Sequence, residues 1–253
     1  MLTTSFVPGS PNWLDVSTPD TAATAAFYSG LFGWDAVSLG PDAGGYGFFQ
    51  LGGKTVAAYG PLPNADATPS WTAYYTTADV DLSAKAVEDA GGTVLAEPYD
   101  VDPAGRTGVF ADPTGGRFML WQAGEIKGLD AVNDAGSLRW LELHTDDPAA
   151  ARAFYQSVFG WTFQDLPMGD HIYGVASFGG ETDTFGGITP QPLGEGNAWH
   201  PYFEVTDADA TVAKAVDLGA TVVRPAESVP GIGRIASLRD PHGASFVVIT
   251  SDS

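Results

Sequence analysis

The chain has no cysteine and few basic residues, with 11 Lys and Arg against 31 Asp and Glu in 253 residues. The missing thiols exclude a disulfide framework, a cysteine nucleophile and a thiolate metal site. The net charge of −20 repels phosphate backbones and anionic lipid, so we expect no nucleic-acid partner and no membrane partner. With only four His, a metal site would have to combine imidazole and carboxylate ligands.

Long apolar runs are missing as well. No segment approaches the roughly 20 apolar residues that span a bilayer, and the first residues lack the features of a secretory signal. Phosphate-binding loops, the dinucleotide-binding glycine pattern and the serine nucleophile elbow are also absent. The charged fraction is 17% and aromatic residues occur along the whole chain, which favours packed cores over disorder. We therefore expect a globular, cytoplasmic protein.

The strongest positive feature is an internal repeat. Asn12–Trp34 and Arg139–Trp161 are identical at 12 of 23 positions, at a constant offset of 127. Similarity continues as far as the late Asp-Pro turns, which begin at Asp112 and Asp240. A duplication of this length indicates two copies of a whole module rather than a short solenoid repeat.

The repeat sets the predicted domain organisation. Module one covers residues 8–122 and module two residues 137–250, joined by a linker at 123–136 that contains Gly, Asp and Asn and has no sustained hydrophobic period. Each module alternates helical and strand patterns, which predicts an α+β fold with mostly antiparallel sheets. The elements predicted in module one are strands at 13–16, 46–51, 55–59, 71–76, 106–111 and 117–121, and helices at 21–31 and 82–90. Gly33 is the expected C-cap of the first helix.

The element order resembles that of the vicinal oxygen chelate superfamily, which includes glyoxalase I, bleomycin-resistance proteins and extradiol dioxygenases. The resemblance is carried by Phe27-Tyr28 followed by Phe32-Gly33-Trp34, by the same residues in module two, and by the Asp-Pro turns. The chain is most similar to the two-module, hydroxylase-like actinobacterial type, some members of which come from aromatic polyketide antibiotic pathways. The resemblance implies four βαβββ units that form cups around a small ligand.

In metal-dependent relatives the ligands come from four strand positions, three of which align here. These positions are Asp15 and Glu142 on the first strand, Thr72 and His200 on the strand that opens the second unit, and Met119 and Val247 on the last strand. For the hairpin strand, the nearest candidates are Glu181 and Asp183, which we place in the turn. Met and Val do not bind a hard divalent cation, so we expect no cofactor. The alternative is Fe, Ni or Zn held by Glu142 and His200.

The predicted catalytic residues are Glu142, His200, Asp15 and His144. Strand alternation places His144 on the same face as Glu142. Carboxylates among aromatic residues and imidazoles near neutral pH are suited to general acid–base catalysis. The alternative is structural: Asp15 and Glu142 would be hydrogen-bonded interface groups, and His200 a core histidine. Module two, which holds all four His, is the expected active module.

The other strand positions predict a largely apolar binding site. The predicted substrate-binding residues are Thr72, Tyr74, Met119, Trp121, Tyr202 and Val247. Such walls fit a flat hydrophobic or aromatic, polyketide-like molecule. The predicted function is a metal-independent enzyme that modifies such a molecule by acid–base or hydroxylase-type chemistry. A metal-dependent lyase or extradiol dioxygenase, and a drug-binding resistance protein without turnover, are the alternatives; both monomer and homodimer remain open.

Overall fold

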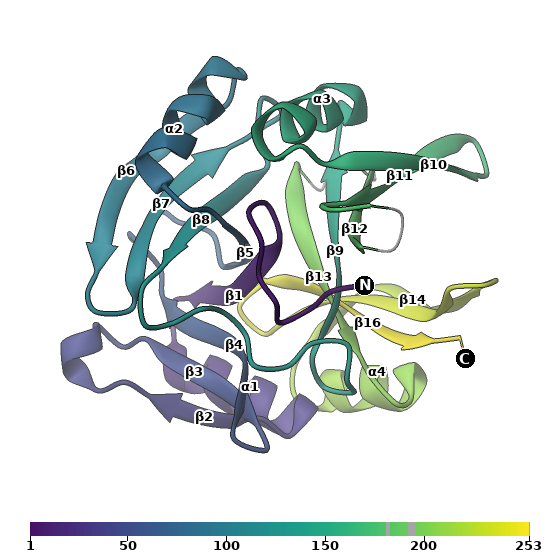
Figure 1. Ribbon diagram of the computed structural model, residues 1–253. Coiled ribbons are helices and arrows are strands. Elements are labelled where there is room, and N and C mark those ends of the chain that lie inside the picture. The colour runs from purple at the N-terminus through teal and green to yellow at the C-terminus, as the bar shows by residue number, and fades with distance from the viewer. Residues whose placement is uncertain (181–182, 192–195, 253) are drawn as a thin grey trace. The chain divides into compact units, whose positions relative to one another are not determined.

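The computed structural model describes residues 1–180, 183–191 and 196–252 (Figure 1). The elements of the first repeat are β1 (Pro11–Thr18), α1 (Thr21–Phe32), β2 (Asp35–Ser38), a 3-10 turn (Pro41–Ala43), β3 (Gly47–Leu51), β4 (Lys54–Pro61), β5 (Ser70–Thr76), α2 (Val80–Asp89), β6 (Thr93–Val101), β7 (Gly105–Ala111) and β8 (Arg117–Ala123). Those of the second are β9 (Leu138–Thr145), α3 (Pro148–Phe159), β10 (Thr162–Met168), β11 (His171–Ser177), β12 (Thr184–Pro190), β13 (Ala198–Glu204), α4 (Ala208–Asp217), β14 (Thr221–Val229), β15 (Gly233–Arg239) and β16 (Ser245–Ser251). No helix in these ranges is long and apolar enough to cross a membrane.

The strands of each repeat belong to one eight-stranded sheet. The orders are β2-β3-β4-β1-β5-β8-β7-β6 and β10-β11-β12-β9-β13-β16-β15-β14. Pairing is parallel between β1 and β4 and between β5 and β8, and antiparallel in the hairpins. Each half-sheet follows the order strand, helix and three strands, so the α+β class and the four βαβββ units predicted from the sequence are confirmed.

The ends of α1 and α3 follow from the same local chemistry in both repeats. Asp20 accepts hydrogen bonds from the first backbone N–H groups of α1, and Asp147 does the same for α3. Both helices end at a left-handed glycine, Gly33 with φ 74° and Gly160 with φ 71°. The predicted C-cap at Gly33 is therefore confirmed.

The sequence did not predict β2 and β6, or their counterparts in the second repeat. These four strands lie at the sheet edges. They have mostly exposed or half-buried residues, and β6 and β14 each contain a proline, Pro98 and Pro225. An edge strand needs neither a strict apolar alternation nor every backbone N–H, so its pattern is weak in the sequence.

The chain also divides into two compact units, each of which draws on both repeats. Unit one contains Met1–Trp13, Thr72–Gly128 and Trp140–Trp199. Unit two contains Leu14–Trp71, Leu129–Arg139 and His200–Ser253. Each compact unit therefore contains residues of both sequence repeats. The limits of the repeats, 8–122 and 137–250, remain a prediction.

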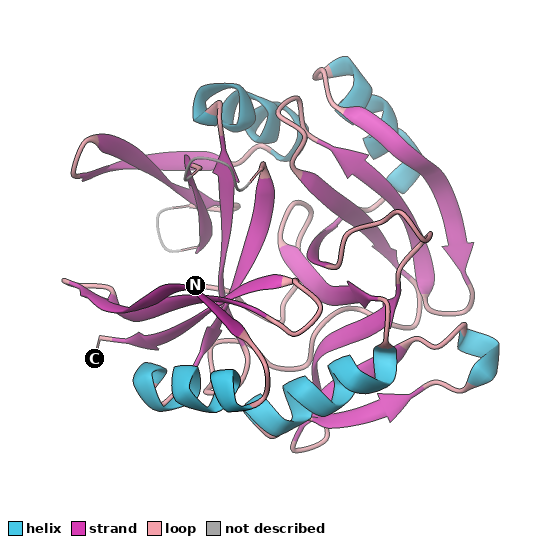
Figure 2. Ribbon diagram, turned by 180° about the vertical axis from the view of Figure 1, so that it is seen from behind, coloured by secondary structure: helices cyan, strands magenta, loops and turns pink. Residues whose placement is uncertain are grey.

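The core of unit two contains a chain of buried hydrogen bonds. Trp71 Nε1 donates to the Tyr28 hydroxyl at 2.9 Å, and that hydroxyl donates to Asp240 Oδ2 at 3.2 Å. Burial raises the pKa of Tyr28 well above its ordinary value, and the negative charge of Asp240 adds to the effect. In the same unit the last turns of α1 and α4 meet (Figure 2), where Lys214 Nζ donates to the Leu31 carbonyl.

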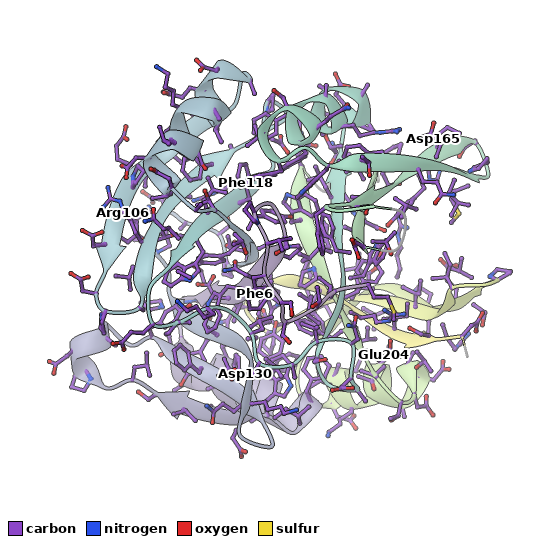
Figure 3. All side chains as sticks on the ribbon, viewed as in Figure 1. Phe6, Arg106, Phe118, Asp130, Asp165 and Glu204 are labelled. Carbon is purple, nitrogen blue, oxygen red and sulfur yellow. The ribbon has the colours of Figure 1, made fainter. Side chains whose placement is uncertain are left out.

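The core of unit one repeats this arrangement with one addition. Trp199 Nε1 donates to the Tyr155 hydroxyl at 3.0 Å, and the hydroxyl donates to Asp112 Oδ2 at 2.9 Å. Phe118, which is labelled in Figure 3, packs its ring edge to face against that of Tyr155. Tyr75 occupies the position of Phe203 in unit two, and its buried hydroxyl has no hydrogen-bond partner among the described residues. Burial and the nearby Asp112 raise the pKa of Tyr75 well above its ordinary value.

The segment between the repeats is anchored rather than extended. Asp130 and Thr55 exchange two hydrogen bonds of 2.8 Å, and Trp34 Nε1 donates to the Gly136 carbonyl at 2.7 Å. Leu129 is 2% exposed. The linker is therefore irregular backbone held by hydrogen bonds and burial, not a loose tether.

Candidate functional site

Glu142 lies in a hydrogen-bonded network on β9 of unit one. Its side chain is mostly buried, and its two carboxylate oxygens have different partners. His144 Nε2 lies 2.7 Å from Oε1, and the Tyr173 hydroxyl donates to Oε2 at 2.7 Å. Trp140 Nε1 donates in turn to the Tyr173 oxygen at 2.8 Å. The network thus holds one carboxylate in a fixed orientation between an imidazole and a phenol.

Strand alternation assigns this network to one face of the half-sheet. The neighbouring residues Leu141 and Leu143 are fully buried and point to the other face. That other face is covered by α3, because a Cβ at Gly174 of β11 would lie 3.3 Å from Arg152 Nε. Gly174 shares a face with Leu143 through the register of β11, β12 and β9. Glu142 therefore faces away from α3.

A glycine lets Tyr173 reach Glu142. The strand between them, β12, places Gly187 opposite Glu142 and opposite Val175 of β11. A Cβ at Gly187 would lie 2.1 Å from the Tyr173 hydroxyl oxygen, which no side chain allows. The Tyr173 ring thus occupies the space that any other residue at position 187 would fill.

Unit two contains a related but simpler pair. The Tyr46 hydroxyl donates to Asp15 Oδ2 at 2.9 Å, and Asp15 is 7% exposed. The residue two positions after Asp15 is Ser17, where the first strand of the second repeat has His144. The carboxylate–tyrosine pair therefore occurs twice, and only the copy in unit one contains an imidazole on the same strand face.

The remaining predicted residues of unit two lie on β13 and β16. His200 and Tyr202 are buried on β13, and Tyr202 is the register partner of Val247 on β16. Glu204 follows on the same face and forms a salt bridge with Arg139 at 3.2 Å. Strand alternation places Glu204 on one face of β13 with His200 and Tyr202, and its carboxylate is held in this ion pair.

The predicted binding residues of unit one also share a strand face. Tyr74 pairs in register with Met119, and both are buried. The rings of Tyr74 and Trp121 meet edge to face, with centroids 6.5 Å apart. Trp121 Nε1 donates to the Ile126 carbonyl at 2.9 Å, so the indole is fixed by the segment that follows β8. Thr72 is half-buried at the start of this strand.

The structure thus brings together some of the predicted residues. Glu142 and His144 are in direct contact, whereas His200 belongs to unit two, as does Asp15. The roles of Tyr173 and Trp140 were not predicted from the sequence. These residues align with Tyr46 and Trp13 of the first repeat at the offset of 127, but a strand pattern does not show that a phenol crosses an intervening strand to reach a carboxylate.

Comparisons with known proteins agree with this architecture. The model of the glyoxalase/bleomycin resistance protein/dioxygenase superfamily matches residues 10–120, and a glyoxalase-like domain model matches residues 140–249. Anthracycline biosynthesis protein DauV of Streptomyces sp. (strain C5) is 41% identical over 276 aligned positions, covering 97% of this chain and 94% of that protein. The chain belongs to the glyoxalase/bleomycin resistance protein/dioxygenase superfamily. The resemblance found in the sequence is therefore confirmed.

Solved structures of the superfamily share the fold at low sequence identity. The Mn(II)-bound glyoxalase from Novosphingobium aromaticivorans is 18% identical with a TM-score of 0.65, covering 97% of this chain and 85% of that chain. The 2,2',3-trihydroxybiphenyl 1,2-dioxygenase from Sphingomonas wittichii strain RW1 is 15% identical with a TM-score of 0.67, covering 97% and 91%. At these identities the likeness shows the common fold alone.

The superfamily includes metal enzymes, so we tested the donor set of this chain. The hairpin strands β4 and β12 contain no His, Asp or Glu, so the hairpin-strand positions carry no donor. The last-strand positions are Met119 and Val247, whose side chains do not suit a hard divalent cation. Among residues 1–180, 183–191 and 196–252, no three His, Asp or Glu side chains form a group that could hold a metal ion. The donor set of the described residues therefore does not suit a divalent cation of the kind that the superfamily's metal enzymes bind.

Two acidic residues in the second hairpin had been considered for that position. Asp183 precedes β12, and its carboxylate lies near Gly179, in the connection before the strand. Glu181 lies outside the described residues.

Proposed function

We propose that this protein is a metal-independent enzyme that isomerises a hydrophobic, aromatic polyketide-like small molecule by acid–base chemistry at Glu142 and His144. The observation that carries this proposal is the Glu142 carboxylate, which is 8% exposed and bonded to both His144 and Tyr173. The anthracycline-related name of DauV, a relative along nearly the whole chain, supports the ligand class.

The pair would work by moving one proton. Glu142 and His144 would accept a proton from an acidic C–H of the ligand and return it to another atom of the same molecule. Such an isomerisation balances without a co-reactant. The carboxylate orients the imidazole through the 2.7 Å contact, while Tyr173 and Trp140 act as positioning residues for the carboxylate.

Hydrogen–deuterium exchange tests the proposal. 1,8-Dihydroxyanthrone has an acidic ring C–H, and its exchange in D2O under nitrogen is followed by mass spectrometry. We expect the protein to accelerate exchange, and Glu142→Gln and His144→Gln to lower the acceleration by about 100-fold or more. Exchange no faster than in buffer would contradict the proposal, and binding without acceleration would favour a binding protein.

Metal dependence is measured on the same samples. Elemental analysis is expected to find less than stoichiometric metal, and exchange is expected to persist after treatment with a chelator. About one bound metal per chain, together with loss of exchange on chelation, would instead favour the metal-dependent lyase or dioxygenase.

A further inference from the structure

The β10–β11 hairpin extends the Glu142 face of unit one beyond Tyr173. In the unbroken antiparallel register of this hairpin, Leu166 is opposite Tyr173 and Met168 is opposite His171. Residues paired in this way point to the same face, so Leu166 and Met168 lie beside Tyr173 on the side that carries Glu142. Figure 1 shows the outer end of the hairpin projecting beyond α3.

The other face of the hairpin is held by α3. Arg152 Nη2 donates to Asp165 at 2.7 Å, and the guanidinium carbon of Arg152 lies 5.1 Å from the centre of the Phe163 ring. Asp165 is labelled on β10 in Figure 3. An ion pair and a cation–π contact thus fix the hairpin from one side, while its Leu166 side keeps an aliphatic surface next to the polar network.

We propose that Leu166 and Met168 are specificity-determining residues that contact the apolar rings of an aromatic ligand whose polar edge reaches Tyr173 and Glu142. This assignment rests on the proposed function for the ligand class. The side chain of Leu166 is 41% exposed, whereas Glu142, further in on the same sheet face, is 8% exposed and hydrogen-bonded. Apolar walls with a few convergent polar groups are the usual construction of small-molecule sites, and Met adapts readily to flat ligands.

The hairpin supplies its own control. Ile172 is 47% exposed on the same hairpin, but it pairs with Pro167 and points to the opposite face. We compare Leu166→Ser, Met168→Ser and Ile172→Ser by titration with 1,8-dihydroxyanthraquinone, followed by tryptophan fluorescence, and check each fold by its melting temperature. Leu166→Ser and Met168→Ser are expected to raise Kd about five- to tenfold, and Ile172→Ser to leave it unchanged.

The outcomes separate this inference from the proposed function. Unchanged Kd in Leu166→Ser, equal weakening by Ile172→Ser, or no binding by the unaltered protein would overturn the assignment of the hairpin. Exchange of the anthrone by Glu142→Gln reports on the proposed function. If that variant exchanges the anthrone as fast as the unaltered protein, the acid–base role fails. The hairpin assignment is decided separately, by the Kd of Leu166→Ser compared with that of Ile172→Ser.

Discussion

The Tyr28 hydroxyl, from the first helix of the first repeat, donates a hydrogen bond to Asp240, in the last turn of the second repeat, at 3.2 Å. Tyr155 of the second repeat reaches Asp112 of the first in the same way, at 2.9 Å. The tyrosine of each repeat is therefore satisfied by an aspartate of the other. The Phe-Tyr signature of each repeat therefore depends on the Asp-Pro signature of the other.

The first prediction compares two buried tyrosines in unit one. Tyr155→Phe leaves Asp112 Oδ2 and the Trp199 N–H without their shared partner, so we expect the free energy of unfolding to fall by about 1–3 kcal/mol. Tyr75→Phe removes a buried hydroxyl without a described partner, and we expect no loss or a small gain in stability. Urea unfolding measures both. Equal destabilisation by the two variants would show that the hydrogen bonds do not decide the difference.

The second prediction concerns alkaline pH. Burial raises the pKa of Tyr28, Tyr75 and Tyr155 above the unfolded value of about 10, so the folded state binds these protons more tightly. Their contribution to stability is fully present below pH 10 and is lost as the pH rises through the folded pKa values. Melting temperatures measured from pH 8 to 11.5 should fall steeply above about 10. The fall should be shallower in Tyr75→Phe, and identical slopes would argue against the shifted pKa of Tyr75.

The third prediction uses the space beneath Tyr173. In Gly187→Ala the new methyl group would sit 2.1 Å from the Tyr173 oxygen, so the phenol must leave Glu142. We expect anthrone exchange to fall by about tenfold or more, as expected for loss of a positioning contact. In a Tyr173→Ala background the same methyl group should cost little further activity, and a double-mutant cycle measures this coupling. Additive effects would contradict the proposed clash.

The fourth prediction separates the two carboxylate–tyrosine pairs. Only the Glu142 pair has an imidazole on its strand face, so Glu142→Gln should abolish exchange while Asp15→Asn retains it within about threefold. The neutral amides keep the size of each side chain. Both variants are followed by anthrone exchange and by melting temperature. A large loss of anthrone exchange in Asp15→Asn, without a change in melting temperature, would show that the Asp15–Tyr46 pair takes part in catalysis.

Much of the architecture could be predicted from the sequence, because its signals are local or repeated. The first helix was expected at 21–31 and is found at Thr21–Phe32, since Asp20 and Gly33 define its ends through short-range hydrogen bonds. The repeat at an offset of 127 residues predicted two modules, and the family resemblance carried by its signature residues implied the βαβββ order. The edge strands β2 and β6 were missed, because exposed edge strands need no clear alternation.

The candidate site could be predicted only in part. The alternation of β9 was enough to place Glu142 and His144 on one face, because both residues lie on one strand. The contact with Tyr173 depends on the register of three strands and on the missing Cβ of Gly187, neither of which a local pattern contains.

The sequence by itself therefore determined the duplication, the fold class and the pair of residues two apart on one strand. Only the tertiary structure decided which aspartate satisfies each buried tyrosine and which phenol holds Glu142. These partners lie far apart in the sequence, 212 residues in the case of Tyr28 and Asp240. Their choice follows from long-range strand register and helix packing, which local propensities leave open.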